Sequence, residues 1–404
     1  MKKNKTKDMT AFDMQAVPQK QNPLLMPLIW GASFFMTRQF RLKIKKINMK
    51  DLKPPYLVLS THQGFADYYI APLVLFPHRA NYVSDMEGFA AFGKWLYRNI
   101  GCIGKRRYVP DYSVMKNIHH SLFKNKQITV IFPESRHSNV GTTSLIPDNM
   151  GRLVKHLGVP LVILSAHGSY LANPFWDEEH TRKSPMEAKL ECIYSSQQVA
   201  DLSAAEIQKR IEKEMQYDEY RWQWDNKIKI DYAKRTEGLH KALYQCRSCG
   251  KEFSMSSEGI RLRCNDCQAI WEMDSYGRLI DTAGTVRHIP KWYEWQRIQV
   301  ADQIKQGIYC LDLSVRIEAL PNEKGFVDMG NGQLTFDRQG FKLEMGGITL
   351  FFPSKHMESL QTEYNYRGKG SCIVLSTQDC CYYIYANEPT FCTTKLQFAV
   401  ELMK

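Results

Sequence analysis

Between residues 56 and 165 the sequence alternates short apolar runs with stretches of helical character. The runs YLVLS (56–60), QITVIF (127–132) and PLVILS (160–165) are rich in Val, Ile and Leu, as buried strands usually are. Strands are also predicted at 81–84 and 189–194. Helices are predicted at 65–76, 88–99, 113–124 and 149–157. This alternation predicts an α/β fold with a sheet flanked by helices.

Downstream of this region the sequence changes character twice. Ser203 and Glu206 have the spacing of a capping box, which predicts a helix that ends near residue 217. Paired cysteines follow from about residue 240, and a Trp-rich helix is predicted after Pro290. From about residue 307 short β-type runs separated by Gly and Asn predict a mainly β domain that closes with a helix at 393–404.

These changes divide the 404 residues into five segments. We predict a basic N-terminal segment at 1–50, an α/β domain at 51–235, a four-cysteine module at 240–280, a helical linker at 281–306 and a β domain at 307–404. A chain of this length is expected to form more than one domain.

Positive charge is concentrated at the N-terminus. The chain has a formal charge of +12, and residues 1–50 hold nine Lys and two Arg against two Asp, a net +9. Residues 23–36, PLLMPLIWGASFFM, would form a helix of roughly 21 Å, shorter than the roughly 30 Å of a bilayer core. With Trp30, Phe34 and Phe35 before a basic tail, the segment is predicted to lie in a membrane interface. The alternative is a helix packed on the domain with a solvated basic tail.

Residues 1–22 are basic and polar and have no secretory signal character. Together with the cysteine usage described below, this predicts a reducing cytoplasm. We therefore expect the protein on the cytoplasmic side of the cell membrane, as a peripheral or monotopic protein.

His62 and Asp67 are the first candidate catalytic pair. They stand in LSTHQGFADYY, directly after a predicted buried strand, and strand ends are where α/β sheets form sites. Residues five apart on one helix diverge by roughly 140°, so the pair can meet only across a turn, which Gly64 permits. Asp67 would then fix the tautomer of His62 and leave its other nitrogen as a base. The alternative from spacing alone is a His that caps a helix.

Four blocks of sequence in order resemble the glycerolipid (lysophospholipid) acyltransferase superfamily. The His-x4-Asp of His62 and Asp67 resembles the first motif. GCIGKRR (101–107) resembles the second, with Arg107 matching its Arg and Gly104 where Phe is usual. FPESRHS (132–138) resembles Phe-Pro-Glu-Gly-Thr-Arg-Ser, and GVPLVIL (158–164) resembles the fourth block. In the third block Ser135 replaces Gly, Arg136 replaces Thr and His137 replaces Arg.

The resemblance covers about residues 50–215 and implies an acyltransferase of the 1-acylglycerol-3-phosphate type. It implies direct attack of an acceptor hydroxyl on a thioester, either acyl-CoA or acyl carrier protein, with His62 as general base and Asp67 as its orienter. Arg107, Glu134, Ser135 and Arg136 are the expected substrate-binding residues, the arginines for an acceptor phosphate. Lys105 and Arg106 are expected to lie in a solvated basic loop, and His167 is expected to be structural or exposed.

Four cysteines have the spacing of a zinc site. Cys246-x2-Cys249 and Cys264-x2-Cys267 are separated by fourteen residues, which is typical of a zinc ribbon. Four thiolates complete the coordination of Zn²⁺ and leave no position for water, so the predicted zinc is structural. The alternatives are a redox-active dithiol pair and a nucleic-acid-binding ribbon that uses Arg247, Lys251, Arg261 and Arg263.

The expected architecture is thus an α/β acyltransferase domain with a mixed sheet flanked by helices, then a small zinc ribbon, then a mainly β C-terminal domain. The pattern of the last segment resembles pleckstrin-homology-like domains in strand order. The expected partners are membrane lipids and, as donor, acyl carrier protein; nucleic acid is not expected. The alternative function is a non-catalytic lipid-binding membrane adaptor with a decayed acyltransferase fold.

Overall fold

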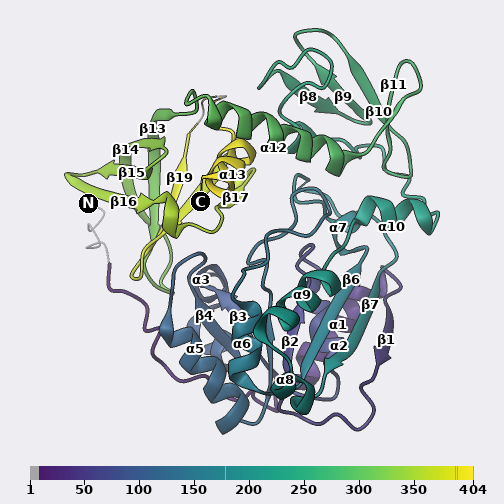
Figure 1. The fold of residues 1–404 in the computed structure, drawn as a ribbon, viewed down its shortest axis with the longest axis vertical. Coiled ribbons are helices and arrows are strands. Elements are labelled where there is room, and N and C mark those ends of the chain that lie inside the picture. Colours follow the sequence, from purple (N-terminus) through teal and green to yellow (C-terminus); the bar gives the residue numbers. More distant parts are fainter. Residues whose placement is uncertain (1–8, 178, 387, 389, 404) are drawn as a thin grey trace, which may run out of the picture. The chain divides into compact units, whose positions relative to one another are not determined.

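The computed structural model describes residues 9–177, 179–386, 388 and 390–403. The chain forms two compact units, and each is discontinuous in sequence (Figure 1). One unit, called the first unit, contains 1–18, 83–117 and 297–404, and the second contains 19–82 and 118–296. The segment 51–235, predicted as one domain, therefore contributes residues 83–117 to the first unit.

The second unit is built on a mixed sheet. Three parallel strands form its centre, with β2 (Leu57–Ser60) between β5 (Ile128–Ile131) and β6 (Leu161–His167). Val58 pairs with Val130 on one side and Val162 on the other, and all three are fully buried. β7 (Glu187–Tyr194) runs antiparallel to β6, and β1 (Lys43–Ile47) runs parallel to β7 at the edge. A mixed sheet with helices fits the α/β expectation.

The strand order of the whole sheet is β1-β7-β6-β2-β5-β3-β4. β3 (Ala80–Asp85) pairs in parallel with β5 and continues from the second unit into the first, to which β4 (Cys102–Lys105) belongs. Two strand segments, β1 and β4, were not predicted. β1 reads KIKKI and has almost no apolar stretch, and lysines of this kind protect an edge strand from pairing with another chain.

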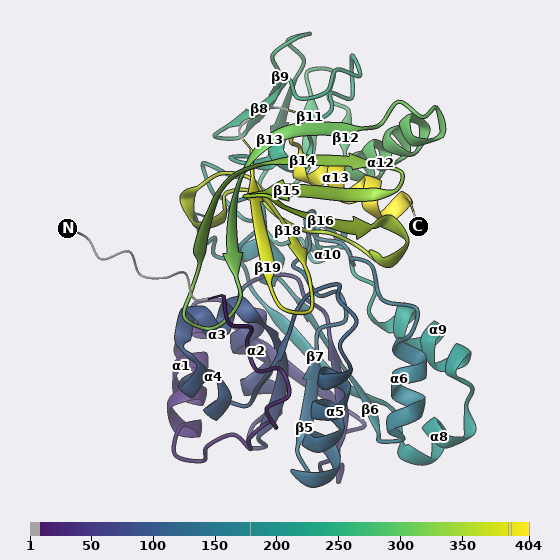
Figure 2. The same cartoon turned by 90° about the vertical axis from the view of Figure 1, so that its left-hand side faces the viewer.

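Helices pack on the sheet of the second unit through apolar residues. α2 (Asp67–Leu75) buries Ile70, Val74 and Leu75 in the main core, together with Val58, Val130 and Val162 of the sheet. α1 (Met26–Arg38) lies against α2, and Trp30 packs edge-on against Phe76 with the ring centroids 4.8 Å apart. α6 (Met150–Leu157) packs on α9 (Ala204–Glu214), with the short helix α8 (Ser196–Asp201) beside them (Figure 2).

Several predicted helices begin or end elsewhere. The predicted helix 88–99 is two helices, α3 (Met86–Phe92) and α4 (Lys94–Asn99), because Gly93 between them has φ 81°. The predicted helix 113–124 is α5 (Tyr112–His119) followed by a π-helical turn, His120–Lys124. α9 begins at the predicted capping box of Ser203 and Glu206, where each side chain accepts from the other's backbone N–H, but it ends at Glu214.

The four-cysteine module is a small antiparallel sheet in the second unit. Its strand order is β12-β11-β10-β9-β8, from β8 (Met255–Glu258), β9 (Arg261–Cys264), β10 (Ile270–Met273), β11 (Leu279–Asp281) and β12 (Val286–Arg287). The Trp-rich segment forms α12 (Ile289–Lys305), as predicted. Trp292 of this helix meets Trp271 of β10 edge-on at 4.8 Å and donates its indole N–H to the carbonyl of Gln245.

The C-terminal part of the first unit is a second, mainly antiparallel sheet. Its strand order is β16-β15-β14-β13-β19-β18-β17, and α13 (Thr393–Leu402) lies beside β17 (Figure 1). Residues 393–400 of α13 are all buried, so the helix completes the core of this sheet. The sheet is formed by β13 (Leu311–Leu320), β14 (Val327–Asp337), β15 (Gly340–Met345), β16 (Ile348–Pro353), β17 (Gln361–Glu363), β18 (Cys372–Ser376) and β19 (Cys381–Tyr385).

Two helical glycines of the second unit should respond oppositely to the same substitution. A Cβ on Gly151 in α6 would lie 2.1 Å from the carbonyl oxygen of Ala204, whereas a Cβ on Gly31 in α1 meets nothing within 4 Å. Gly151→Ala should lower the free energy of unfolding by about 2 kcal/mol through overpacking. Gly31→Ala should raise it by about 0.5–1 kcal/mol through helix propensity. Urea unfolding of both variants measures the difference, and a stabilised Gly151→Ala would contradict the close packing of α6 on α9.

Candidate active site

Three parallel strands deliver polar side chains to the same edge of the sheet. Two residues after β2 comes His62, three residues after β5 comes Glu134, and β6 ends at His167. Because these strands are parallel neighbours, their carboxyl ends meet at one edge, the usual place for a site in an α/β sheet.

The turn between β2 and α2 brings His62 and Asp67 together. The His62 Nδ1 lies 3.3 Å from the Asp67 Oδ2, and both side chains are buried. The turn is close-packed at Gly64, where a Cβ would lie 3.1 Å from the carbonyl oxygen of Ser169. The predicted contact of the pair therefore exists, and the alternative of a His that only caps a helix does not describe this geometry.

Asp67 is held in place by the backbone of the same turn. Its Oδ2 accepts from the backbone N–H of Gln63 at 2.6 Å and of Gly64 at 3.1 Å, as well as facing His62. Two backbone donors stabilise a carboxylate at the first turn of α2, and the carboxylate in turn favours the His62 tautomer protonated at Nδ1. Nε2 is then the nitrogen that carries a free lone pair.

Three aromatic side chains pack around the His62 imidazole. The Tyr68 hydroxyl lies 3.5 Å from Nε2, and the rings of Phe132 and His137 lie 4.6 and 4.3 Å from the imidazole centroid. The contact with Tyr68 is long for a hydrogen bond, and Tyr68 is 37% exposed.

Glu134 is buried and anchors the backbone of His62. Its Oε1 accepts from the His62 backbone N–H at 2.9 Å, and its Oε2 accepts from Ser144 N at 2.7 Å and from the Tyr217 hydroxyl at 3.0 Å. Burial raises the pKa of Glu134 to about 7, against the lowering effect of these donors and of Arg136. In this structure Glu134 positions His62, a role that the sequence does not reveal.

Ser135 adopts a backbone conformation that favours glycine. Its φ is 55°, in the left-handed region, and its hydroxyl lies 3.4 Å from the carbonyl oxygen of Pro133. This is the position at which the resembling family has Gly, and a side chain here costs roughly 1 kcal/mol. Ser135 thus stands at a turn position where a glycine would be less strained.

The arginines expected to bind phosphate differ in their surroundings. Arg136 is buried near Glu134, and its positive charge lowers the pKa of Glu134. Arg107, which belongs to the first unit, forms an ion pair with Asp85. Arg106 was expected in a solvated loop, and this is wrong. It is only 3% exposed because its guanidinium donates to the carbonyls of Pro321, Gln378 and Asp379 within the first unit.

A second acid–histidine pair lies at the same edge of the sheet. His167 Nδ1 is 2.8 Å from Glu219 Oε1, and the His167 ring stacks on Trp222 at 5.1 Å. Glu219 also accepts from the backbone N–H of Gly168, and burial raises its pKa. Sequence spacing gives no signal for this pair because the partners are 52 residues apart.

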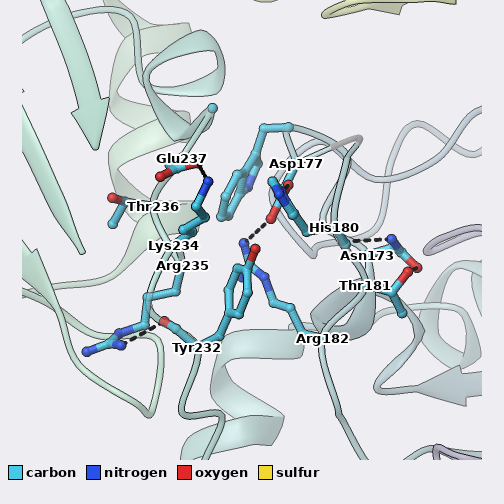
Figure 3. A network of polar contacts seen from close by, with 12 residues as sticks. Asn173, Asp177, His180, Thr181, Arg182, Tyr232, Lys234, Arg235, Thr236 and Glu237 are labelled. Atoms are coloured by element: carbon cyan, nitrogen blue, oxygen red, sulfur yellow. Dashed lines mark hydrogen bonds and ion pairs between the residues drawn. The ribbon is translucent and has the colours of Figure 1, made fainter. Parts of the chain in front are cut away.

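The loop after the short helix α7 (Ser169–Ala172) carries a third polar network (Figure 3). Asp177 accepts from Arg182 Nη2 at 2.9 Å and lies 2.9 Å from His180 Nδ1. Figure 3 shows Arg182 reaching toward Asp177, with the ring of Tyr232 beside it. The Arg182 guanidinium lies 4.8 Å from the Trp176 ring and 5.3 Å from the Tyr232 ring, so its charge is buried among a carboxylate and two π faces.

The four cysteines converge, as their spacing predicts. All four sulfur atoms lie within 4.8 Å of one another, with 3.7 Å between Cys246 and Cys267 and 3.8 Å between Cys249 and Cys264. A tetrahedral zinc with Zn–S bonds of about 2.3 Å separates its sulfur atoms by about 3.8 Å. The residues therefore fit a Zn²⁺ ion, with Cys246 and Cys264 on the buried side.

Three of the basic residues of this module contact other side chains of the module or of α12. Arg247 lies over the ring of Trp295 at 4.4 Å, and Arg261 pairs with Glu272 at 2.8 Å. Arg263 donates to the side chain of Gln268. These contacts reduce the positive surface that a nucleic-acid-binding ribbon would need.

The raised pKa of Glu134 gives a prediction for stability against pH. Its folded-state pKa of about 7 exceeds the unfolded value of 4.5, so its favourable contribution is complete below pH 4.5 and is lost as pH rises through 7. The free energy of unfolding of wild type minus that of Glu134→Gln should fall across this window, by at most about 3 kcal/mol. Denaturant titrations at a series of pH values measure it. A difference that is flat from pH 4.5 to 7 would contradict the assignment.

Comparison with known proteins addresses part of the chain. No curated protein matches it. Among solved structures, the 1-acyl-sn-glycerophosphate (LPA) acyltransferase PlsC from Thermotoga maritima has 16% sequence identity and a TM-score of 0.40, over 47% of this chain and 76% of that one. In the part of the chain that the structure describes, no helix is both long and apolar enough to cross a bilayer. A model of the Acyltransferase family matches residues 41–165, which contain His62, Asp67, Arg107 and Glu134, and through this segment the chain is similar to the acyltransferases.

Proposed function

We propose that this protein transfers an acyl chain from a thioester donor to the hydroxyl of a lysophospholipid or acylglycerol phosphate at the cytoplasmic membrane surface. The observation that carries the proposal is the arrangement of His62. Asp67 holds its Nδ1, Glu134 holds its backbone, and Nε2 faces the partly exposed Tyr68 hydroxyl at 3.5 Å. The match of residues 41–165 to the Acyltransferase family supports the same reaction class.

The proposed step needs no covalent enzyme intermediate. The acceptor O–H gives its proton to His62 Nε2 as its oxygen attacks the thioester carbonyl carbon. The carbon–sulfur bond then breaks, and the thiolate leaves as the thiol of coenzyme A or acyl carrier protein after it receives that proton. Asp67 stabilises the imidazolium that forms between the two transfers. Arg107, Ser135 and Arg136 remain the proposed substrate-binding residues.

The surface of the second unit supports a membrane location. Leu24, Leu28, Phe34 and Phe35, in and just before α1, are between 57% and 82% exposed. Beyond α1 the chain enters the edge strand β1, in which Lys43, Lys45 and Lys46 are exposed. Exposed apolar side chains beside lysines are what a helix in an anionic lipid interface presents. Trp30, expected among these anchors, instead packs on Phe76.

We also propose that Cys246, Cys249, Cys264 and Cys267 hold one structural zinc ion. The sulfur separations support this, as does the module's small size, because the few buried residues of such a sheet rarely stabilise it without a metal. The pleckstrin-homology-like character of the C-terminal sheet is proposed from its strand pattern and closing helix alone.

Replacement of the catalytic pair tests the reaction. His62→Ala should lower kcat for acyl transfer by about 10²- to 10⁴-fold because the base is lost, and Asp67→Asn should lower it by a similar factor because the tautomer is no longer fixed. Initial rates with acyl-CoA or acyl carrier protein and a panel of lysolipids measure both. His156→Ala, an exposed histidine on α6, is the matched control and should leave kcat unchanged.

Two outcomes would contradict this proposal. If His62→Ala keeps the full rate on the best acceptor, the base is elsewhere. If the wild type binds vesicles of anionic phospholipid but transfers no acyl chain from either donor, and His62→Ala binds equally well, the protein is the non-catalytic adaptor.

Metal analysis tests the cysteine site separately. The purified protein should contain one zinc per chain, and Cys264→Ser should lose it together with several kcal/mol of the module's stability. Cys192→Ser, at a half-buried cysteine outside the cluster, should keep the metal. A Cys246–Cys249 disulfide in protein purified without reductant, with no zinc, would indicate the redox-active alternative.

A further inference from the structure

The loop formed by residues 173–177 and 179–184, here called the wall loop, borders the candidate active site. Phe175 packs edge-on against His137 at 6.0 Å, and His137 in turn packs against His62 at 4.3 Å. The neighbouring Trp176 is 1% exposed and donates its indole N–H to the Tyr170 hydroxyl at 2.9 Å. The wall loop therefore contacts His137, a ring that packs directly on the proposed base.

A second segment, residues 228–239, here called the strap, is bound to the four-cysteine module. The Thr236 hydroxyl donates to the carbonyls of Gly259 and Arg261 at 3.0 and 3.1 Å, and Arg235 Nε donates to that of Met273 at 2.6 Å. Gly238 N donates to the Ser257 hydroxyl at 3.0 Å. These bonds connect the strap to β8, β9 and β10, three strands of the four-cysteine module.

The strap also packs directly on the wall loop. A Cβ on Gly238, whose φ is 90°, would lie 2.0 Å from the carbonyl oxygen of Trp176, so the two backbones touch. Tyr232 of the strap covers the Arg182 guanidinium, which also pairs with Asp177 and lies over Trp176 (Figure 3). Arg182 is thus shared by the two segments.

Burying the charge of Arg182, which contacts both segments, costs free energy. It is 6% exposed, and its Nε has no hydrogen-bond partner among the described residues. A buried, incompletely bonded charge is maintained only where the surroundings fix it, so the Arg182 geometry depends on both Asp177 and Tyr232 being in place.

We propose that the four-cysteine module, acting through the strap, positions the wall of the acyl-transfer site, with Arg182 as the positioning residue at the joint. The geometry around His62 then depends on whether the cysteines hold their metal. This proposal rests on the proposed acyl transfer for its catalytic consequence, but the mechanical coupling stands independently of it.

Hydrogen exchange of the full-length protein tests the coupling without reference to activity. Peptides that cover the wall loop and the strands β8–β10 are compared in zinc-loaded protein, in protein stripped with a chelator, and after zinc is restored. We expect exchange in the wall loop to rise about tenfold or more with that of the strands, and to recover with zinc. Faster exchange in β8–β10 with an unchanged wall loop would overturn the proposal.

A pair of glycine variants tests the joint with the metal in place. Gly238→Ala forces the strap away from Trp176, whereas Gly284→Ala, in the β11–β12 turn, has a similar positive φ but no atom within 4 Å of the new Cβ. Both variants should keep one zinc. Only Gly238→Ala should speed exchange in the wall loop and lower kcat/KM for acyl transfer, by about tenfold. Equal wall-loop exchange and equal kcat/KM in the two variants would overturn the proposal. Because both variants are measured with zinc bound, this test remains decisive even if the zinc-free protein is unstable.

Kinetic measurements distinguish failure of the proposed acyl transfer from failure of the proposed coupling. Arg182→Lys keeps the charge but loses the planar contact with Trp176 and Tyr232, and it should lower kcat more than it raises KM because His62 is misplaced in the bound complex. If the wild type shows no acyl transfer, the proposed function fails while the exchange results still decide the coupling. If the wild type is active and Gly238→Ala matches it in rate and exchange, the coupling fails alone.

Discussion

The pairing of β2 between β5 and β6 is the constraint on which the candidate site depends. The three strands are buried and parallel, so their carboxyl ends fall at one edge and bring His62, Glu134 and His167 there from positions up to 105 residues apart. A register shift of one residue in β2 would turn His62 to the other face of the sheet. The Glu134 bond to the His62 backbone links two of these strand ends a second time.

The site contains buried carboxyl groups, and each is stabilised by its own set of hydrogen-bond donors. Asp67 and Glu134 are both almost fully buried, yet Asp67 receives two backbone N–H groups from its own turn, whereas Glu134 receives its donors from three separate segments. At Glu134 burial outweighs these donors and raises the pKa to about 7. One carboxyl is therefore suited to orient a base and the other to brace the loop that carries it.

The sequence predicts the parts of this protein that local patterns encode. Apolar runs located β2, β5 and β6, the capping box located the start of α9, and the cysteine spacing located the cluster. His62 and Asp67 were found because a turn and a strand end leave a local signature. Glu134 with Tyr217, His167 with Glu219, and Arg182 with Tyr232 were not found in these roles, because each pair is 50 or more residues apart and meets only through the tertiary fold. Arg106 was misjudged for the same reason, since its acceptors are carbonyls more than 200 residues away.

The discontinuity of the two units has a consequence for synthesis on the ribosome. The chain passes between the units four times, at 18/19, 82/83, 117/118 and 296/297. Residues 83–117 are therefore made long before residues 297–404, which complete their unit, and the nascent chain must carry α3 and α4 without that partner through about 180 residues of elongation. Phe92 and Trp95 are more than half exposed even in the finished fold, so this stretch presents apolar side chains to water both during synthesis and afterwards.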